Sequence, residues 1–390
     1  MDIVLISPVS PFAAPDGHRL AVLSDLSAIL DNGLRAGMIS FTYDGEENVT
    51  PPLCANRTIP ALNGGFAHRF IRGLFKGQPP SAERLYSSSA SRLVRSALSE
   101  WKPPVVIIDD ASVSGYVPLI REVLPDAKVI LRSHNVMHDV RMEQLQRTAG
   151  ITRPAVKYDC GRYLKLERDA VEQCDAHWAI TTADAHRMRQ LYGRATSCLT
   201  VSIPVDKYAM LRPEHGLSNG FVHVGTLDFR RRSELEAFLA GSWPRVLEAD
   251  PDATLTLAGA MWGRRVEARN VDYRGRVAND YEVYRLGRFA LNFQCSTGGI
   301  KLKTLTSLAA GRTLLSTARG VEGLPLESGK HYWEIGEFLE NQNLKDLLKH
   351  VRATQPIADA GRQYVAENHS RGFVARQMAA LLGETQGEGR

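Results

Sequence analysis

The feature of this sequence that most restricts its fold is a repeated alternation of short β-rich runs with helical patterns. In the first half, the predicted strands lie at 2–8, 37–43, 105–109, 128–133, 177–181 and 198–202. Helical patterns fall between them, for example at 20–32, 116–124 and 156–173. Strands that alternate with helices in this way predict a parallel sheet with helices on both of its faces.

A second series of the same kind follows, with predicted strands at 221–225, 254–259, 271–275, 289–294, 313–317 and 331–335. Single cores stop growing beyond about 250–300 residues, so a chain of 390 residues is expected to form two domains. The sequence therefore predicts an α/β protein with two Rossmann-like, doubly wound parallel-sheet domains that face a cleft.

The predicted domain boundaries follow from where the periodic pattern stops. An N-terminal domain is expected at 1–203 and a C-terminal domain at 220–365. The segment 204–219 carries two prolines and loses periodicity, so it is the predicted linker. The last segment, 366–390, is read as a C-terminal helix and a solvated tail, and a return of this helix to the N-terminal domain is one option.

Composition and charge restrict the class of protein and its partners. The net charge of +5 suits anionic small molecules or an anionic membrane surface, and no nucleic-acid partner is expected. The five cysteines form no C-x-x-C pair, which is typical of free thiols in a reducing compartment. No run approaches the roughly 18 apolar residues of a membrane-spanning helix, and the chain begins with a strand-like run without a basic leader. These features predict a cytoplasmic protein.

Two strand-to-helix loops of the first half hold candidate site residues. The first, SPVSPFAAPDGHR, leads through prolines to Asp16 and Gly17, where the backbone and a helix N-terminus could approach a ligand, unless this is a simple turn. The second, RSHNVMHDVR, places His134, Asn135 and His138 beyond a strand end, where α/β domains bind ligands. The two histidines lack a third metal ligand at a suitable spacing. A hydrogen bond from His134 to a substrate hydroxyl, or a turn cap at Asn135, is therefore favoured.

Cationic side chains follow the first strand of the second series. In HVGTLDFRRRSELEAFL the strand ends at Gly225, and Arg230 and Arg231 precede a helix. Guanidinium groups bind phosphate in a bidentate manner, so this loop is a candidate phosphate site. The alternative is a solvated basic loop.

A second cationic segment is GGIKLKTLTSLAAGRTLLST, in which a Gly-Gly pair leads into a helix that begins near Ile300. Lys301 and Lys303 fall in the first helical turn, where cations oppose the helix dipole. This position is unfavourable unless an anion lies among them, so the pattern indicates a diphosphate. The alternative is that both lysines point into water.

Two further segments stand out. RGVEGLP places Glu322 in a loop after a predicted strand, where its carboxylate could accept hydrogen bonds from ribose or sugar hydroxyls, unless it is a turn residue. GGFAHRFIRGLFKG (64–77) alternates apolar with basic residues, which is typical of a segment that touches an anionic membrane. A core helix with a charged outer face is the alternative.

Taken together, these stretches resemble a GT-B glycosyltransferase of the family 4 type, also called group 1. GGIKLKTLTSLAAGRTLLSTARGVEGLP is similar to the GGxKLK variant of the family's donor motif, and RGRVANDYEVY is similar to its "GxV-D-xxxxY" segment. HNVMHDVR resembles the H-N motif of the N-terminal half. The resemblance implies sugar transfer from a nucleotide-diphosphate donor, usually with retention and without a cofactor or an essential metal.

The resemblance also implies roles for individual residues. The reacting centre would hold His134, Asp16 and Gly17, and the acceptor would contact Asn135 and His138. The donor would be held by Gly225, Arg230, Arg231, Gly299, Lys301, Lys303, Thr306, Glu322 and Gly323. Many members carry two glutamates eight positions apart, and these positions are Gly298 and Thr306 here. The second glutamate usually grips the ribose, and Thr306 can form a hydrogen bond but lacks the charge.

Three functions remain open at this point. The first is a glycosyltransferase of bacterial surface polysaccharide or lipopolysaccharide assembly, with a glycan or lipid-linked acceptor and a peripheral membrane contact through 64–77. The second is a non-catalytic GT-B protein that binds a nucleotide sugar or supports a partner enzyme, which Thr306 favours. The third is a nucleotide-sugar epimerase, for which the sequence offers few acid and base groups.

Overall fold

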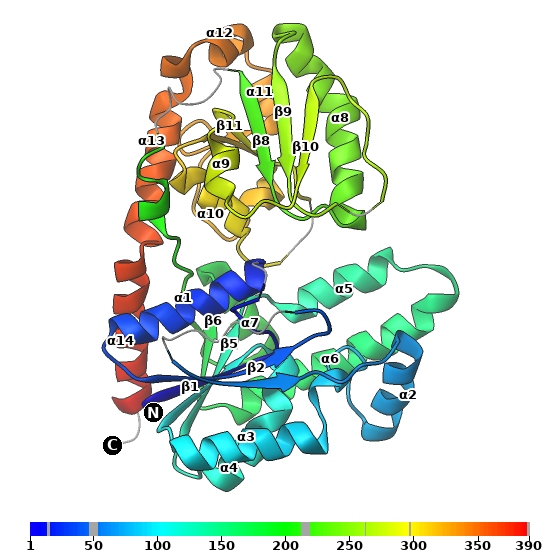
Figure 1. Cartoon of the computed structure of the whole chain (residues 1–390), viewed down its shortest axis with the longest axis vertical. Coiled ribbons are helices and arrows are strands. Elements are labelled where there is room, and N and C mark those ends of the chain that lie inside the picture. Colours follow the sequence, from blue (N-terminus) through cyan, green and yellow to red (C-terminus); the bar gives the residue numbers. More distant parts are fainter. Residues whose placement is uncertain (14–15, 47–53, 212–218, 262, 296–297, 388–390) are drawn as a thin grey trace. The chain divides into compact units, whose positions relative to one another are not determined.

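The computed structural model describes residues 1–13, 16–46, 54–211, 219–261, 263–295 and 298–387 (Figure 1). Contacts divide the chain into two compact units. The first comprises Met1–Ser202, Thr297–Gly299 and Arg371–Arg390, and the second comprises Ile203–Ser296 and Ile300–Ser370. Each unit contains one parallel sheet with helices on both faces, so the predicted α/β class with two doubly wound sheets is confirmed.

The sheet of the first unit has the strand order β3-β2-β1-β4-β5-β6-β7, and every pair is parallel. Its strands are β1 (Ile3–Ser7), β2 (Ala36–Thr42), β3 (Ala55–Pro60), β4 (Val105–Asp109), β5 (Lys128–Ser133), β6 (Ala176–Ala179) and β7 (Ser197–Cys198). The direction of the order reverses between β1 and β4. Ligands of such sheets bind beyond the carboxyl ends of the strands at this reversal.

Helices cover both faces of the first sheet. The helices of this unit are α1 (Gly17–Asp31), α2 (Phe66–Lys76), α3 (Ser88–Trp101), α4 (Val117–Val123), α5 (Met137–Arg147), α6 (Arg153–Gln173), α7 (Thr182–Tyr192) and α14 (Arg371–Gly387). One core layer joins Leu26 of α1 and Met378 of α14 to the sheet, and the other contains Val94 of α3 and Ile120 of α4. The strands are therefore buried on both faces, as their continuous apolar runs predict.

The C-terminal helix belongs to the first unit. α14 packs beside α1, where the Asn32 side-chain amide donates to the carbonyl oxygen of Ala375 at 2.8 Å. The preceding helix, α13 (Val351–Asn368), continues three residues beyond the predicted boundary at 365.

The sheet of the second unit has the order β10-β9-β8-β11-β12-β13 and is also parallel. Its strands are β8 (Gly220–Val224), β9 (Thr254–Ala258), β10 (Val271–Gly275), β11 (Phe289–Asn292), β12 (Thr313–Ser316) and β13 (Trp333–Glu334). Its helices are α8 (Phe229–Ala249), α9 (Asp280–Tyr284), α10 (Leu302–Ala309), α11 (Ile335–Leu339), α12 (Leu344–Lys349) and α13. Aromatic side chains fill one face, where Phe221 stacks on Phe289 and meets Trp243 edge-on.

The described part of the predicted linker 204–219 is not a free connection. It contains a 3-10 turn, η4 (Val205–Tyr208), and Tyr208 is only 1% exposed. The Tyr208 hydroxyl donates to Asp280 at 2.8 Å, and its ring lies 5.9 Å from that of Tyr284. This segment is therefore part of the second unit, whereas residues 212–218 lie outside the described part.

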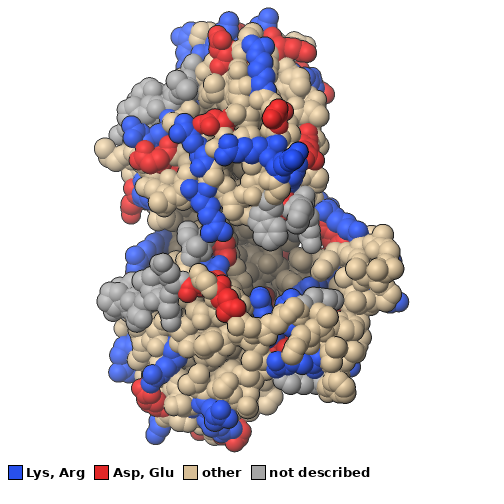
Figure 2. Space-filling model, turned by 45° about the vertical axis from the view of Figure 1, so that its right-hand side comes forward, with Lys and Arg blue, Asp and Glu red and all other residues tan. Residues whose placement is uncertain are grey.

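No helix among the described residues is both long enough and apolar enough to cross a membrane. On the face drawn in Figure 2, Lys and Arg gather in several separate clusters, and Asp or Glu lies next to most of them. This distribution fits the modest net charge of +5.

Candidate functional site

In the second unit, the candidate site is centred on the carboxyl end of β8. The strand runs into Gly225. A Cβ atom at Gly259 would lie 2.0 Å from the Gly225 carbonyl oxygen, so the backbone segments at these two glycines approach too closely for any other residue at position 259. A Cβ atom at Gly225 would lie 3.4 Å from Lys303 Nζ and 3.4 Å from His223 Nε2. The ammonium group of Lys303 therefore reaches from α10 to the end of β8.

Lys303 occupies the electrostatic position that the sequence predicts. It lies in the first turn of α10, which has no acidic residue and no side-chain cap. Burial, assisted by the cation of Arg231, lowers the pKa of Lys303 to about 7, although the carboxylate of Glu234 acts in the opposite direction. In the described part of the chain, Lys303 has no carboxylate at ion-pair distance. A half-buried cation at a helix N-terminus is unfavourable unless an anion joins it.

Two side chains around Lys303, the buried His223 and the half-buried Glu234, are site residues that the sequence does not predict. His223 donates from Nδ1 to the Leu291 carbonyl oxygen at 2.8 Å, and burial holds its pKa well below the usual range, so it stays neutral. Glu234 accepts from the backbone N–H of Cys295 at 2.9 Å through Oε1, whereas its buried Oε2 has no partner among the described residues. Glu234 follows Arg231 by three residues, a helical spacing that the sequence could have revealed.

Lys301 and Glu322 form a second part of this site. Lys301 is the N-cap of α10, is 6% exposed and places Nζ 3.9 Å from Glu322 Oε2. Glu322 also pairs with Arg319 in the loop after β12. The carboxylate that the sequence assigned to sugar or ribose hydroxyls is thus held by two cations, beside Gly323, which adopts φ +83°.

Arg231 lies in the first turns of α8, and its guanidinium donates to the Thr226 carbonyl oxygen at 3.3 Å and lies 3.6 Å from Asp228. Its exposed fraction of 34% leaves it accessible to a ligand. The side chain of Arg230 lies outside the described part of the chain.

Thr306 takes part in an internal hydrogen-bond network. Its hydroxyl lies 2.9 Å from the Tyr284 hydroxyl and 3.2 Å from the Lys303 carbonyl oxygen. Because a threonine hydroxyl has one hydrogen to donate, these contacts use much of its capacity. Thr306 therefore offers a ligand less than the glutamate of the related motif.

In the first unit, three side chains meet at the carboxyl ends of β1, β4 and β5. Asp109, the last residue of β4, accepts from His18 Nε2 through Oδ2 at 3.0 Å and from His134 Nε2 through Oδ1. The two imidazole rings lie 4.9 Å apart. Asp109 is 1% exposed and His134 is 6% exposed, whereas 29% of the His18 side chain is exposed. We call these three residues the imidazole–carboxylate cluster.

The pKa values within this cluster follow from burial and mutual attraction. Burial alone would lower the pKa of His18, but the carboxylate of Asp109, assisted by Asp110 and Asp16, outweighs it and raises the pKa to about 9. Burial alone would raise the pKa of Asp109, but His134 and His18 hold it well below its usual range. The cluster thus contains an ionised carboxylate with a protonated His18 beside it.

The other predicted residues of the first unit surround this cluster. Asp16 is the N-cap of α1 and accepts from the backbone N–H of Arg19 at 2.9 Å. Gly17 begins the helix. Gly299 groups with the first unit, and a Cβ atom there would lie 2.5 Å from Asn135 Oδ1. Asn135 is therefore next to His134 in the sequence, and Gly299 is next to it in space, since the same Cβ atom would lie 2.5 Å from the His134 carbonyl oxygen.

His138 does not join His134. Its Nδ1 lies 2.9 Å from Asp139, and its backbone N–H donates to Glu167 at 3.0 Å. The residues that His134 does contact, His18 and Asp109, are not predicted from the sequence. The available signals were a histidine directly after the Asp16-Gly17 turn and an aspartate at the end of the run VVIID.

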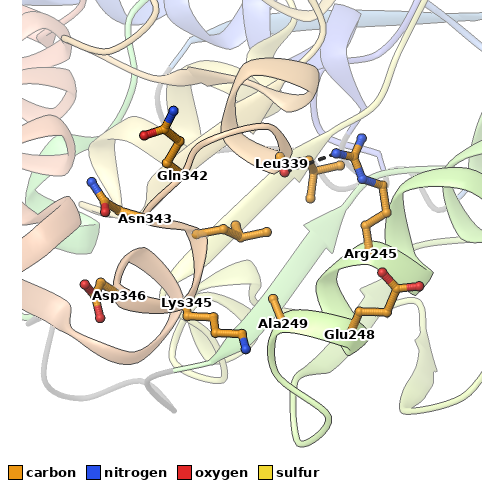
Figure 3. A pocket seen from close by; sticks show the side chains of 9 residues that line it. Arg245, Glu248, Ala249, Leu339, Gln342, Asn343, Lys345 and Asp346 are labelled. Atoms are coloured by element: carbon orange, nitrogen blue, oxygen red, sulfur yellow. Dashed lines mark hydrogen bonds between the residues drawn. The ribbon is translucent and has the colours of Figure 1, made fainter.

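A separate hollow of about 420 Å³ lies beside the C-terminal end of α8 (Figure 3). It is lined by Arg245, Glu248 and Ala249 of α8 and by residues of α11 and α12 and the turn between them. The Arg245 guanidinium donates to the Leu339 carbonyl oxygen at 3.3 Å. Because α8 starts beyond the carboxyl end of β8 and ends just before β9, this hollow is remote from Lys303.

Comparisons with known proteins agree on the architecture. Solved structures that match the whole chain include sucrose-phosphate synthase from Thermosynechococcus elongatus, with 14% identity, 100% of both chains covered and a TM-score of 0.70. The chain has the GT-B fold. Anabaena HepE in complex with UDP and glucose matches with 11% identity, 98% and 100% coverage and a TM-score of 0.68. TarM matches with 10% identity, 98% coverage of each chain and a TM-score of 0.68. No family model and no curated protein matches the chain.

Proposed function

We propose that this chain is a glycosyltransferase that moves a sugar from a nucleotide-diphosphate donor to a glycan or lipid-linked acceptor. The observation that carries the proposal is Lys303, a half-buried cation at the N-terminus of α10 without a carboxylate at ion-pair distance among the described residues. Support comes from neighbours of the same fold, since Anabaena HepE was solved with UDP-glucose and a starch synthase IV domain with ADP and acarbose.

The chemistry of the second unit suits a diphosphate leaving group. Negative charge develops on that group as the bond to the sugar breaks, and fixed cations lower the barrier by stabilising it. Lys303, Lys301 and Arg231 supply positive side chains, and the N-terminus of α10 adds the positive end of its dipole. This set of cations can neutralise a diphosphate with no metal ion bound to the phosphates, in line with a retaining transfer that has no essential metal.

The first unit supplies the groups for the sugar. His134 is buried and fixed through Nε2 by Asp109, and its Nδ1 has no partner among the described residues. A nitrogen held in this way can form a hydrogen bond with a sugar hydroxyl. Asn135 follows directly and is the candidate contact for the acceptor.

Bacterial surface polysaccharide or lipopolysaccharide assembly is the proposed setting, with a peripheral contact to the cytoplasmic membrane through α2. The helix leaves Phe75 89%, Ile71 54% and Leu74 46% exposed, so these three apolar residues face outward. A core helix with a charged outer face would show the reverse. Exposed apolar residues next to cations are typical of helices that lie in a membrane interface.

The neighbouring surface adds to this membrane face. Phe70 of α2 packs edge-on against Tyr158 of α6 at 5.5 Å. Tyr158 also borders a hollow of about 430 Å³ that Lys157 and Arg162 line, where a lipid phosphate would meet two cations. Arg72 has a different task, because it pairs at 2.8 Å with Glu83, whose side chain is buried.

A panel of nucleotide sugars tests the proposed activity. Donor hydrolysis and thermal stabilisation should both occur with at least one donor, and Lys303→Met should abolish most of the stabilisation. Lys345→Met, an exposed lysine of α12 beside the hollow in Figure 3, is the matched control and should behave as wild type. Failure of every donor to bind would refute the proposal.

One observation favours a second function, a non-catalytic protein that binds a nucleotide sugar. The hydroxyl of Thr306 is used by Tyr284 and the Lys303 carbonyl oxygen, so the ribose would lack a charged partner at this position. Binding of a donor without hydrolysis or transfer in the same panel would support this function.

A further inference from the structure

Three metal-ligating side chains from distant parts of the chain converge in the first unit. His18 stands in the first turn of α1, Asp109 ends β4 and His134 follows β5. One ligand atom from each lies within 4.8 Å of the others, and no other group of this kind occurs in the part of the chain that is described. We propose that the imidazole–carboxylate cluster binds a divalent transition metal ion of the zinc, cobalt or nickel class.

The donor set selects the class of ion. Both histidines direct Nε2 toward the carboxylate of Asp109, so the site offers two imidazole nitrogens and a carboxylate oxygen. Imidazole suits zinc, cobalt and nickel, whereas magnesium and calcium prefer a shell made of oxygen atoms. Three protein ligands leave at least one coordination position for water or a substrate hydroxyl.

The surroundings favour a cation at this point. Asp109 is almost completely buried, and a buried carboxylate needs a compensating positive charge. Two more carboxylates lie nearby, because Asp110 follows Asp109 directly and Asp16 is the N-cap of the helix that carries His18. The site therefore offers negative charge that a divalent ion can offset.

The position of Asp109 is fixed before any ion arrives. The next residue, Asp110, adopts φ +79°, which is costly for a residue other than glycine and points to a function. The Asp110 carboxylate accepts from the Ser112 backbone N–H and from the Tyr163 hydroxyl, both at 2.8 Å. These bonds hold the end of β4 and keep the ligand set together.

The histidines can also take the required protonation state. An imidazole that binds a metal through Nε2 carries its proton on Nδ1. Nδ1 of His134 has no hydrogen-bond partner in the described residues, so no donor there requires Nδ1 to be unprotonated. The partly exposed His18 provides a route by which an ion enters.

This inference goes beyond the proposed transfer reaction, because the ligands all belong to the first unit and binding needs no nucleotide. Zinc binding and nucleotide-sugar binding are therefore measured in separate experiments, and the absence of one leaves the other proposal intact. The cations around Lys303 remain the groups for the diphosphate in either case.

The test is a titration of the full-length chain after dialysis against a chelator. We expect one zinc ion per chain by calorimetry and, with cobalt, visible absorption bands typical of nitrogen and oxygen ligands. His18→Gln should weaken zinc binding by roughly tenfold or more. His186→Gln, which changes an exposed histidine of α7, is the matched control and should bind as wild type.

Thermal unfolding of the metal-free variants shows whether each is folded. Should His18→Gln unfold, His134→Gln provides the second variant, with the cobalt spectrum of the wild-type chain as an independent readout. Absence of stoichiometric binding by the wild-type chain would overturn the proposal. Binding that His18→Gln and His134→Gln both leave unchanged would overturn it as well.

Discussion

The affinity for a nucleotide sugar should fall as the pH rises through the neutral range, because Lys303 must be protonated to bind a diphosphate. Burial, with the cation of Arg231, lowers the pKa of Lys303 to about 7 in the ligand-free chain. A bound diphosphate stabilises the ammonium form and raises this pKa. Above pH 7 the free chain thus binds fewer protons than the complex, so rising pH opposes binding.

The size of the effect follows from the pKa. At about pH 8 roughly nine in ten Lys303 side chains are neutral before binding, and at about pH 6 roughly one in ten is neutral. Protonating Lys303 on binding then costs about 1.4 kcal/mol more at the higher pH. The dissociation constant should therefore rise about tenfold between these two pH values.

Calorimetry with UDP-glucose is the assay, because the diphosphate of a nucleotide sugar carries no proton that titrates in this range. Repeating the titration in buffers with different ionisation enthalpies should reveal the uptake of about 0.9 proton at about pH 8. Lys303→Arg keeps its charge at every pH and should lose the dependence. Lys345→Arg should keep it. An affinity of the wild-type chain that does not change with pH would refute the reasoning.

Glu234 tunes this dependence. Its carboxylate favours the ammonium form of Lys303, so Glu234→Gln should move the midpoint of the affinity profile to lower pH. The amide oxygen of glutamine can still accept from the Cys295 backbone N–H, as Glu234 does at 2.9 Å, so the local structure should persist. A midpoint that stays in place or moves upward would show that Glu234 does not act on Lys303.

Two further predictions concern the membrane face and stability. Phe75→Ser should reduce flotation with anionic liposomes about tenfold or more, because inserting a phenylalanine is worth about 1.5–3 kcal/mol. Met210→Ser, also at an exposed apolar residue, should change nothing, and equal losses would refute a specific face. Asp25→Ala should destabilise the chain by about 3–5 kcal/mol in urea unfolding because it leaves buried Arg132 unpaired. The control is the solvent-exposed ion pair between Asp2 and Arg35, and Asp2→Ala should change the free energy of unfolding little.

Much of the fold could be predicted because parallel strands buried on both faces leave continuous apolar runs in the sequence. The sequence does not predict β3, because half of its residues ANRTIP are polar and only Ile59 is buried, as suits an edge strand. The linker was misjudged because Tyr208 is buried through Asp280 and Tyr284, which lie more than seventy residues away. Such packing leaves no local signal.

The candidate site shows the same division. The place of Lys301 and Lys303 at the start of a helix could be predicted because the helix N-terminus and its lysines are adjacent in the sequence. His18 and Asp109 could not, since they are 91 residues apart and meet only because β1 pairs with β4. Strand order is set by long-range packing, which a single sequence does not display.

The two strand orders nevertheless explain why charged groups converge in each unit. β1, β4 and β5 occupy the same places in the first sheet as β8, β11 and β12 in the second. The first set leads to His18, Asp109 and His134, and the second leads to Arg231, Lys303 and Glu322. At each reversal of strand order, three chain segments end side by side and leave space between their helices. One architecture thus creates two charged clusters, and only the residue types differ, a carboxylate between imidazoles in one unit and lysines near a carboxylate in the other.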